Sequence, residues 1–126
     1  MTLPFTFADA TGDLALSDFD ANFAAVGALV TIPCTITGVN TLILTPAVGS
    51  PAIPNYANYL RVCGVPVDTN TAAAAARVGP LALLQIYLDS PTGPRPLIGY
   101  EIVAGNLITL VYDSALDGGS GGWHLL

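Results

Sequence analysis

His124 is the only histidine of the sequence, and its side chain is the one whose ordinary pKa lies close to neutral pH. A catalytic triad would add a nucleophile and an orienting acid to such a base. Serines and aspartates lie near His124 in the sequence, but in segments typical of turns, and no nucleophile elbow is predicted around them. We therefore expect His124 at a strand surface or in a subunit contact beside Trp123, and we expect no enzymatic activity.

Three acids could supply the pair of carboxyl groups that cleaves a glycosidic bond: Asp89, Glu101 and Asp113. That reaction needs two carboxyl groups about 5 to 9.5 Å apart at one site. The three acids fall on different predicted strands, so the sequence leaves their separation open. Because 9 acids in 126 residues make accidental pairs common, catalysis by such a pair is not the interpretation we favour.

One pattern is typical of metal ligands: Asp18-x-Asp20-x-Asn22 has the spacing that opens a calcium-binding loop. The sixth position of that loop requires glycine and here is Phe23, and the twelfth requires glutamate and here is Leu29. The acids fit the start of a helix better, where negative charge is stabilised by the helix dipole. We expect no metal site and no cofactor.

Aromatic rings could form a platform on which a sugar stacks. The rings that we single out are Tyr56, Tyr59 and Trp123, with His124 beside them, as possible glycan or subunit contacts. Such rings are also ordinary in the core or the interface of a β-domain. We favour packing or interface contact and keep sugar binding as the alternative.

Charge is scarce in this chain. Residues 21–60 include no charged side chain, lysine is absent, and only 10% of all residues are charged, against about 25% in an average soluble domain. A surface so poor in charge is most easily explained if other protein covers it. The net charge of −6 argues against nucleic acid as a partner. The most apolar window, residues 24–44, alternates with period two and includes Pro33 and Gly38, so we expect no membrane insertion.

Residues 1–27 are predicted to form an extended arm followed by one short helix. Leu3, Phe5 and Phe7 alternate with other residues, as in a strand-like arm. Ser17 can cap the helix, and Gly27 can end it in a left-handed conformation. The apolar stripe of this helix follows the spacing i, i+4 and i+7, at Phe19, Phe23 and Val26.

Residues 28–126 are predicted to form a β-domain. The alternation of apolar and polar residues is strongest in Val30–Ile36, where Pro33 predicts an edge strand or a backbone position turned outward. The other predicted strands are Thr41–Thr45, Tyr59–Gly64, Leu81–Leu88, Leu97–Val103, Leu107–Asp113 and Gly122–Leu126. Residues 104–106 are predicted to join two of them as a hairpin, and residues 91–96 and 117–122 are predicted turns.

Two further features of this domain are an alanine-rich run whose secondary structure the sequence leaves open, and a pair of cysteines. The run Thr71–Arg77 contains five alanines and fits a short helix or an alanine-rich strand equally well. Cys34 and Cys63 lie in predicted strands, and we expect two buried free thiols and no disulfide. Short, regularly spaced strands with Gly/Pro turns predict an antiparallel β-sandwich or a barrel-like domain.

Three stretches of the chain form recognisable motifs. The first is LPFTFADATGDLALSDFDANFAAVG, with a short arm and a helix pattern at Leu16, Phe19, Asp20, Asn22 and Phe23. The others are VTIPCTITGVNTLILTPAVGSPAIPNY and EIVAGNLITLVYDSALDGGSGGWHLL. The first stretch resembles the N-terminal region of tailed-bacteriophage fibre and spike proteins, and the other two resemble the β-domain that follows it in those proteins. The resemblance covers nearly the whole chain, and its motifs are structural.

This resemblance implies a virion structural protein that assembles as a homotrimer. Its arm and helix would dock on other virion proteins through Phe5, Phe7, Phe19 and Phe23, and the trimer would cover free strand edges. The chain ends at Leu126, before the receptor-binding part of longer relatives, so we expect a short tail fibre, an adaptor, or a head-fibre or decoration component. The alternative is a carbohydrate-binding module that contacts a host-surface glycan.

Overall fold

The computed structural model describes residues 31–126, and this part of the chain is mainly β-structure. Its regular elements are eight strands and one turn of 3-10 helix. In chain order they are β1 (Thr31–Thr37), β2 (Thr41–Pro46), β3 (Arg61–Gly64), β4 (Ala75–Val78), β5 (Leu84–Ser90), β6 (Gly93–Pro96), β7 (Ile108–Asp113), η2 (Asp117–Gly119) and β8 (Gly122–Leu125). The predicted arm and helix of residues 1–27 lie outside the described residues.

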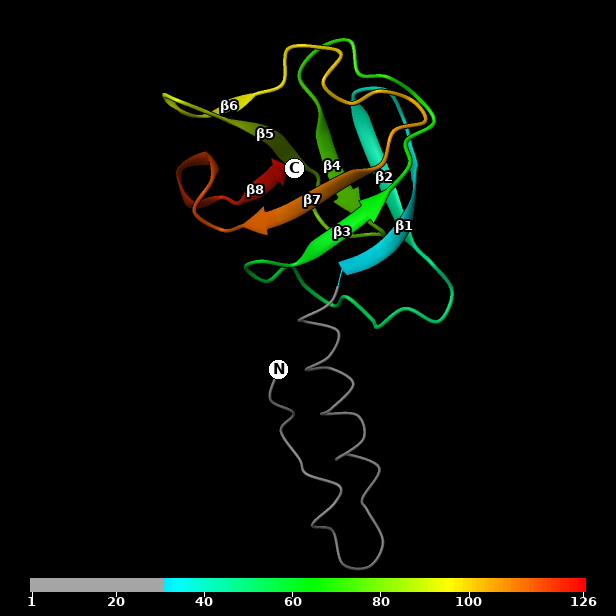
Figure 1. Cartoon of the computed structure of the whole chain (residues 1–126). Coiled ribbons are helices and arrows are strands. Elements are labelled where there is room, and N and C mark those ends of the chain that lie inside the picture. The colour runs from blue at the N-terminus through cyan, green and yellow to red at the C-terminus, as the bar shows by residue number, and fades with distance from the viewer. Residues whose placement is uncertain (1–30) are drawn as a thin grey trace, which may run out of the picture.

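The strands close into a barrel. Neighbouring strands pair in the order β4-β2-β1-β3-β7-β8-β5, and a further pairing of β4 with β5 joins the two ends of the series. β6 pairs with β5 and lies outside this closed, seven-stranded ring. Figure 1 shows β1, β3 and β7 side by side, with the hairpin of β5 and β6 projecting from the ring. The prediction of a mainly β, barrel-like domain is confirmed.

The strand pairing is mixed, so the prediction of an antiparallel domain is wrong in part. β1 runs parallel to β3, β2 to β4, and β5 to β8. Parallel neighbours need a long crossover between them. The segments that separate these strands in the sequence supply that length, and a strand pattern alone does not reveal which strands they bring together.

Alternation positions the first two strands as the sequence predicts. Along β1 the residues are exposed and buried in turn, with Ile32, Cys34 and Ile36 facing the interior. β2 pairs with β1 so that Thr35 lies opposite Thr45 on the outer face. Full burial of an isoleucine or leucine side chain contributes about 1.5–3 kcal/mol. The side chains that fill the barrel include Ile32, Ile36, Leu42, Leu44, Val62, Ala76, Ile86, Leu110 and Trp123.

Of the two alternatives for Pro33, the edge strand is wrong, because β1 is an interior strand. β1 has β3 on one side and β2 on the other. Pairing with β2 begins only at Cys34, one residue after the proline, and the Pro33 carbonyl accepts a hydrogen bond of 2.9 Å from the Ala47 N–H. The proline is therefore accommodated where the ladder with β2 starts.

The segment Leu97–Val103 is not a strand, and this prediction is wrong. Gly99 and Tyr100 have φ angles of 136° and 65°, which interrupt an extended chain. The Tyr100 N–H donates to the carbonyl of Asn70 at 2.8 Å, and the Ile102 N–H donates to the side-chain oxygen of Asn70 at 2.8 Å. Asn70 thus replaces a neighbouring strand, and residues 104–106 form a turn that joins no hairpin.

The structure also decides the state of two shorter segments. Of the alternatives for Thr71–Arg77, the strand is correct, because Ala75–Val78 forms β4 between β2 and β5. Small side chains suit this place, since the indole N–H of Trp123 reaches the Ala76 carbonyl at 3.1 Å. The predicted turn at residues 91–96 contains β6, so the chain reverses more tightly there than predicted.

Candidate functional site

Four side chains form a row across the outer face of the barrel. The register places Arg61 of β3 opposite Val111 of β7, Val111 opposite His124 of β8, and His124 beside Tyr87 of β5. Side chains directly opposite one another on neighbouring strands lie about 5 Å apart at Cβ. The sequence separates these residues widely, and the pairing order β3-β7-β8-β5 within the sheet brings them together.

His124 lies between two carboxylates on this row. Its Nδ1 is 2.9 Å from Oδ1 of Asp89, and its Nε2 is 2.9 Å from Oδ2 of Asp113. A neutral imidazole has one N–H and can satisfy only one of these acceptors, whereas the protonated ring donates to both. The geometry therefore favours a positively charged His124 that links β5 and β7 across β8.

The hydrogen bonds between His124 and the aspartates also shift the pKa values of these groups. Burial alone would lower the pKa of His124, but hydrogen bonds to Asp113 and Asp89 outweigh it and raise the pKa above the ordinary value of 6.5. The hydrogen bond from His124 lowers the pKa of Asp113 below its ordinary 3.8. The histidine's contribution to stability is thus complete below its unfolded pKa and is lost as the pH rises through its folded pKa. The aspartate's contribution is complete above 3.8 and is lost as the pH falls through its folded pKa.

A cavity of about 240 Å³ opens beside this cluster. Tyr59 stands at it with 75% of its surface exposed and a φ of 70°. A positive φ is uncommon for tyrosine, and here the Tyr59 N–H donates to the Tyr112 carbonyl at 2.9 Å. The cavity is lined by Tyr59, Arg61, Asp89, Val111, Tyr112, Asp113, His124 and Leu126. Tyr59 and His124, both singled out from the sequence, therefore share one site.

Tyr56 and Trp123 lie elsewhere: Trp123 is inside the barrel, and Tyr56 is half-buried against the core. Trp123 is 0% exposed, and its ring contacts Tyr56 edge-on at 5.1 Å and Tyr112 at 5.8 Å between centroids. The Tyr56 hydroxyl donates to the Ala82 carbonyl at 2.7 Å and accepts from the Val78 N–H at 3.1 Å. The expected packing role fits both rings, and the expectation of a glycan or subunit contact is wrong for the buried Trp123.

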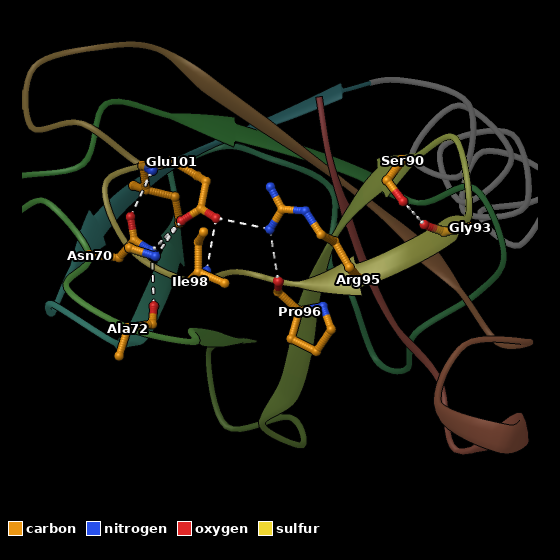
Figure 2. A network of polar contacts seen from close by, with 10 residues as sticks. Asn70, Ala72, Ser90, Gly93, Arg95, Pro96, Ile98 and Glu101 are labelled. Carbon is orange, nitrogen blue, oxygen red and sulfur yellow. Dashed lines mark hydrogen bonds and ion pairs between the residues drawn. The ribbon is translucent and has the colours of Figure 1, made fainter.

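Glu101 is the centre of a separate polar network, shown in Figure 2. Its carboxylate accepts hydrogen bonds from the N–H groups of Ile98 at 2.8 Å and Gly99 at 2.7 Å, and from the Asn70 amide at 3.0 Å. It also forms an ion pair of 3.2 Å with Arg95. Burial alone would raise the pKa of Glu101, but these bonds lower it to about 2. The network fastens the segment of residues 97–102 to the barrel.

Glu101 and Asp113 are therefore ill suited to act as general acids. A glycosidase needs one carboxyl group whose pKa is raised, so that it carries a proton near neutral pH. Here the pKa of both groups is lowered. Asp89 and Asp113 share their bonds with one histidine, and Glu101 is engaged in its own network. Ser120 stands in a Gly-rich turn between η2 and β8, not between a strand and a helix as in a nucleophile elbow.

A second hollow, of about 400 Å³, lies where the ends of β5 and β8 meet the segment of residues 101–108. Its lining is mostly apolar: Leu88, Glu101, Val103, Asn106, Leu107, Ile108, Leu125 and Leu126. Leu107 and Leu126 are 69% and 62% exposed. Leu126 lines both hollows, so the polar cavity and the apolar hollow adjoin.

The remaining predicted sites concern thiols, metals and membranes. Cys34 and Cys63 are free; Cys34 is buried, as predicted, whereas Cys63 is only partly buried, so the prediction of burial is wrong for Cys63. Burial raises the pKa of the Cys34 thiol to about 11. Within residues 31–126, no group of three or more His, Cys, Asp or Glu side chains could hold a metal ion. Over the same residues, no helix has the length and apolarity to cross a membrane. Phe5, Phe7, Phe19 and Phe23 lie outside the described residues.

Sequence reasoning missed two residues of these sites, Arg61 and Asn70. Alternation in β3 could have placed Arg61 on the outer face, but nothing in the sequence gives the register of β3 against β7. Asn70 is the one buried polar side chain of the described residues, and no local sequence pattern marks it as buried.

No protein-family model matches this chain, and neither does any curated protein or any solved structure.

Proposed function

We propose that this chain is a non-enzymatic structural protein of a tailed-bacteriophage virion, and that it assembles as a homotrimer and attaches to the particle. The resemblance of three sequence stretches to phage fibre and spike proteins supports the virion part of the proposal. The composition of one face of the barrel supports the assembly part. A short tail fibre, an adaptor and a head-fibre or decoration component all fit this role.

The observation that carries the proposal is that the outward residues of β1 and β2 carry no charge; charge begins on the flanking strands, with Arg61 of β3 beside Thr31 and Arg77 of β4 beside Ile43. The strands β1 and β2 come from the uncharged stretch of residues 21–60. The inward residues of β1 and β2 fill the core and account for much of the apolar character of the chain. Their exposed residues are threonines and a proline: Thr31, Pro33, Thr35, Thr37, Thr41 and Thr45. This set is called the threonine face below.

A second copy of the chain is the occupant that this face fits best. Depletion of charge is what distinguishes the centre of a protein–protein interface from ordinary surface. Threonine is β-branched and packs well on a pleated surface, and two identical uncharged faces meet without leaving a buried charge unpaired. The charged cluster of Arg61, Asp89 and His124 would be a poor choice for the same contact.

The absolute mass in solution tests the assembly. Size-exclusion chromatography with light scattering should give a stable mass near three chains for the wild-type protein. Thr35→Lys places a charge at the centre of the threonine face, opposite Thr45, and should reduce that mass to one chain. Thr92→Lys, at an exposed turn between β5 and β6, is the matched control and should leave the trimer intact. A wild-type monomer, or a Thr35→Lys trimer, would refute the trimeric interface.

Attachment to the particle is tested separately. Phe5, Phe7, Phe19 and Phe23 remain the proposed docking residues, since buried aromatic side chains dominate many interfaces. A protein lacking residues 1–27 should fold but no longer enter virions. If the truncated protein enters virions at the wild-type level, docking through this segment is excluded.

A further inference from the structure

We propose that the cavity beside Tyr59 is a binding site for one neutral sugar ring. The site lies on the outer face of β3, β7, β8 and β5, whereas the threonine face belongs to β1 and β2. The inference therefore goes beyond the assembly role and does not depend on it. It narrows the alternative of carbohydrate binding to named residues and one class of ligand.

The charges of the site balance. Arg61 and the protonated His124 each carry one positive charge, and Asp89 and Asp113 each carry one negative charge. An anion such as phosphate would face two carboxylates, and a cation would face the imidazolium and the guanidinium. A neutral ligand that offers both hydrogen-bond donors and acceptors meets no such repulsion. The vicinal hydroxyl groups of a sugar offer both.

The polar groups are positioned for hydroxyl groups. His124 uses one oxygen of each aspartate, Oδ1 of Asp89 and Oδ2 of Asp113, which leaves the second oxygens able to accept from ligand hydroxyls. Oδ1 of Asp113 accepts one bond of 2.9 Å from the Ala115 N–H and has a further lone pair. Arg61 forms no ion pair with any residue in the described part of the chain, so its guanidinium can donate to a ligand oxygen.

Tyr59 supplies the apolar part of the site. It is 75% exposed at the cavity, and a ring so exposed gains from covering by a flat, weakly polar partner such as one face of a pyranose. The pattern of an aromatic surface with a few convergent polar groups is typical of small-molecule sites. The volume of about 240 Å³ lies below the 300–1,000 Å³ of drug-sized pockets, so we infer a single ring.

The two hydrogen bonds of His124 order the site before a ligand binds. His124 fixes two aspartates from strands on either side of β8, so their free oxygens keep a constant separation. A preorganised site loses less conformational entropy on binding than a site that must be ordered. His124 and the two aspartates that it bonds, called the histidine clamp below, would thus serve to preorganise a ligand site.

The test is an NMR titration of the whole chain with four probes: D-glucose, D-galactose, D-mannose and N-acetyl-D-glucosamine, each at millimolar concentration. At least one sugar should produce saturable shifts at Tyr59, Arg61 and the single imidazole of His124. Tyr59→Asn, in which asparagine tolerates the positive φ, should weaken this binding about ten-fold or more.

Tyr100→Asn is the matched control. Tyr100 is 74% exposed with a φ of 65°, nearly identical to Tyr59, but it does not line the cavity. This variant should bind sugar as the wild type does. The absence of saturable shifts with all four sugars, equal affinity of Tyr59→Asn and wild type, or preferential binding of inorganic phosphate at these residues would each overturn the proposal. Because the readout is binding and not mass, its failure is distinguishable from failure of the trimer.

Discussion

Replacement of Asn70 by leucine should destabilise the protein by about 3–5 kcal/mol. Asn70 is 0% exposed, and its side chain makes three hydrogen bonds: to the Ala72 carbonyl at 3.0 Å, to the Glu101 carboxylate at 3.0 Å and from the Ile102 N–H at 2.8 Å. Leaving the buried Ile102 N–H without an acceptor costs about 1–3 kcal/mol, and losing the bond to a charged group costs about 1.5–3 kcal/mol. The exposed Ala72 carbonyl can bond water instead and adds little.

Urea denaturation measures this loss, and Asn40→Leu provides a close control. Asn40 also makes three side-chain hydrogen bonds, with Thr71 Oγ1 and with the N–H groups of Thr71 and Ala72, but all three are exposed to water. Its replacement should cost no more than about 1 kcal/mol, because water takes over the lost partners. If Asn70→Leu costs as little as Asn40→Leu, the reasoning that burial and the charged partner fix the segment of residues 97–102 is refuted.

Two further predictions concern the histidine clamp and the buried thiol. The stability of the wild type relative to His124→Gln should be greatest between about pH 4 and pH 6 and should decline as the pH rises through the pKa of His124, which is raised above 6.5. Urea midpoints from pH 4 to beyond that pKa measure the difference, and a difference independent of pH contradicts the clamp. Cys34 should react with a thiol reagent at neutral pH far more slowly than a free cysteine, because burial raises its pKa to about 11; a rate matching that of unfolded protein would show that the thiol is not enclosed.

The fold could be predicted where local pattern decides the outcome. The strict alternation in residues 30–37 and 41–45 predicts two strands with the correct inward residues, because one face of each strand must be buried and the other is wet. The segment of residues 97–103 has equally strand-like composition, but positive φ angles at Gly99 and Tyr100 break it. Its backbone partner is a side chain 32 residues distant along the chain, which no local pattern reveals.

The candidate site could be predicted only as separate residues. The sequence marks Tyr59 and His124 as possible glycan or subunit contacts, and both line the cavity. Of the three acids that could supply a catalytic pair, Asp89, Glu101 and Asp113, the structure places Asp89 and Asp113 on His124. What the sequence lacks is the parallel pairing of β5 with β8, since non-local register depends on the crossover and not on the strands themselves.

Barrel closure also changes the argument for assembly. Free strand edges invite pairing with other chains unless they are covered, and coverage of such edges was one of the reasons to expect a trimer. In the described part of the chain the β4–β5 pairing removes the edges of the ring. The outermost strand, β6, is four residues long and carries Pro94, Arg95 and Pro96, which disfavour strand addition. Among the described residues, the closed ring thus offers a second copy side chains on a face of the barrel in place of free strand edges, and the proposed trimer would use the threonine face, whose own residues carry no charge.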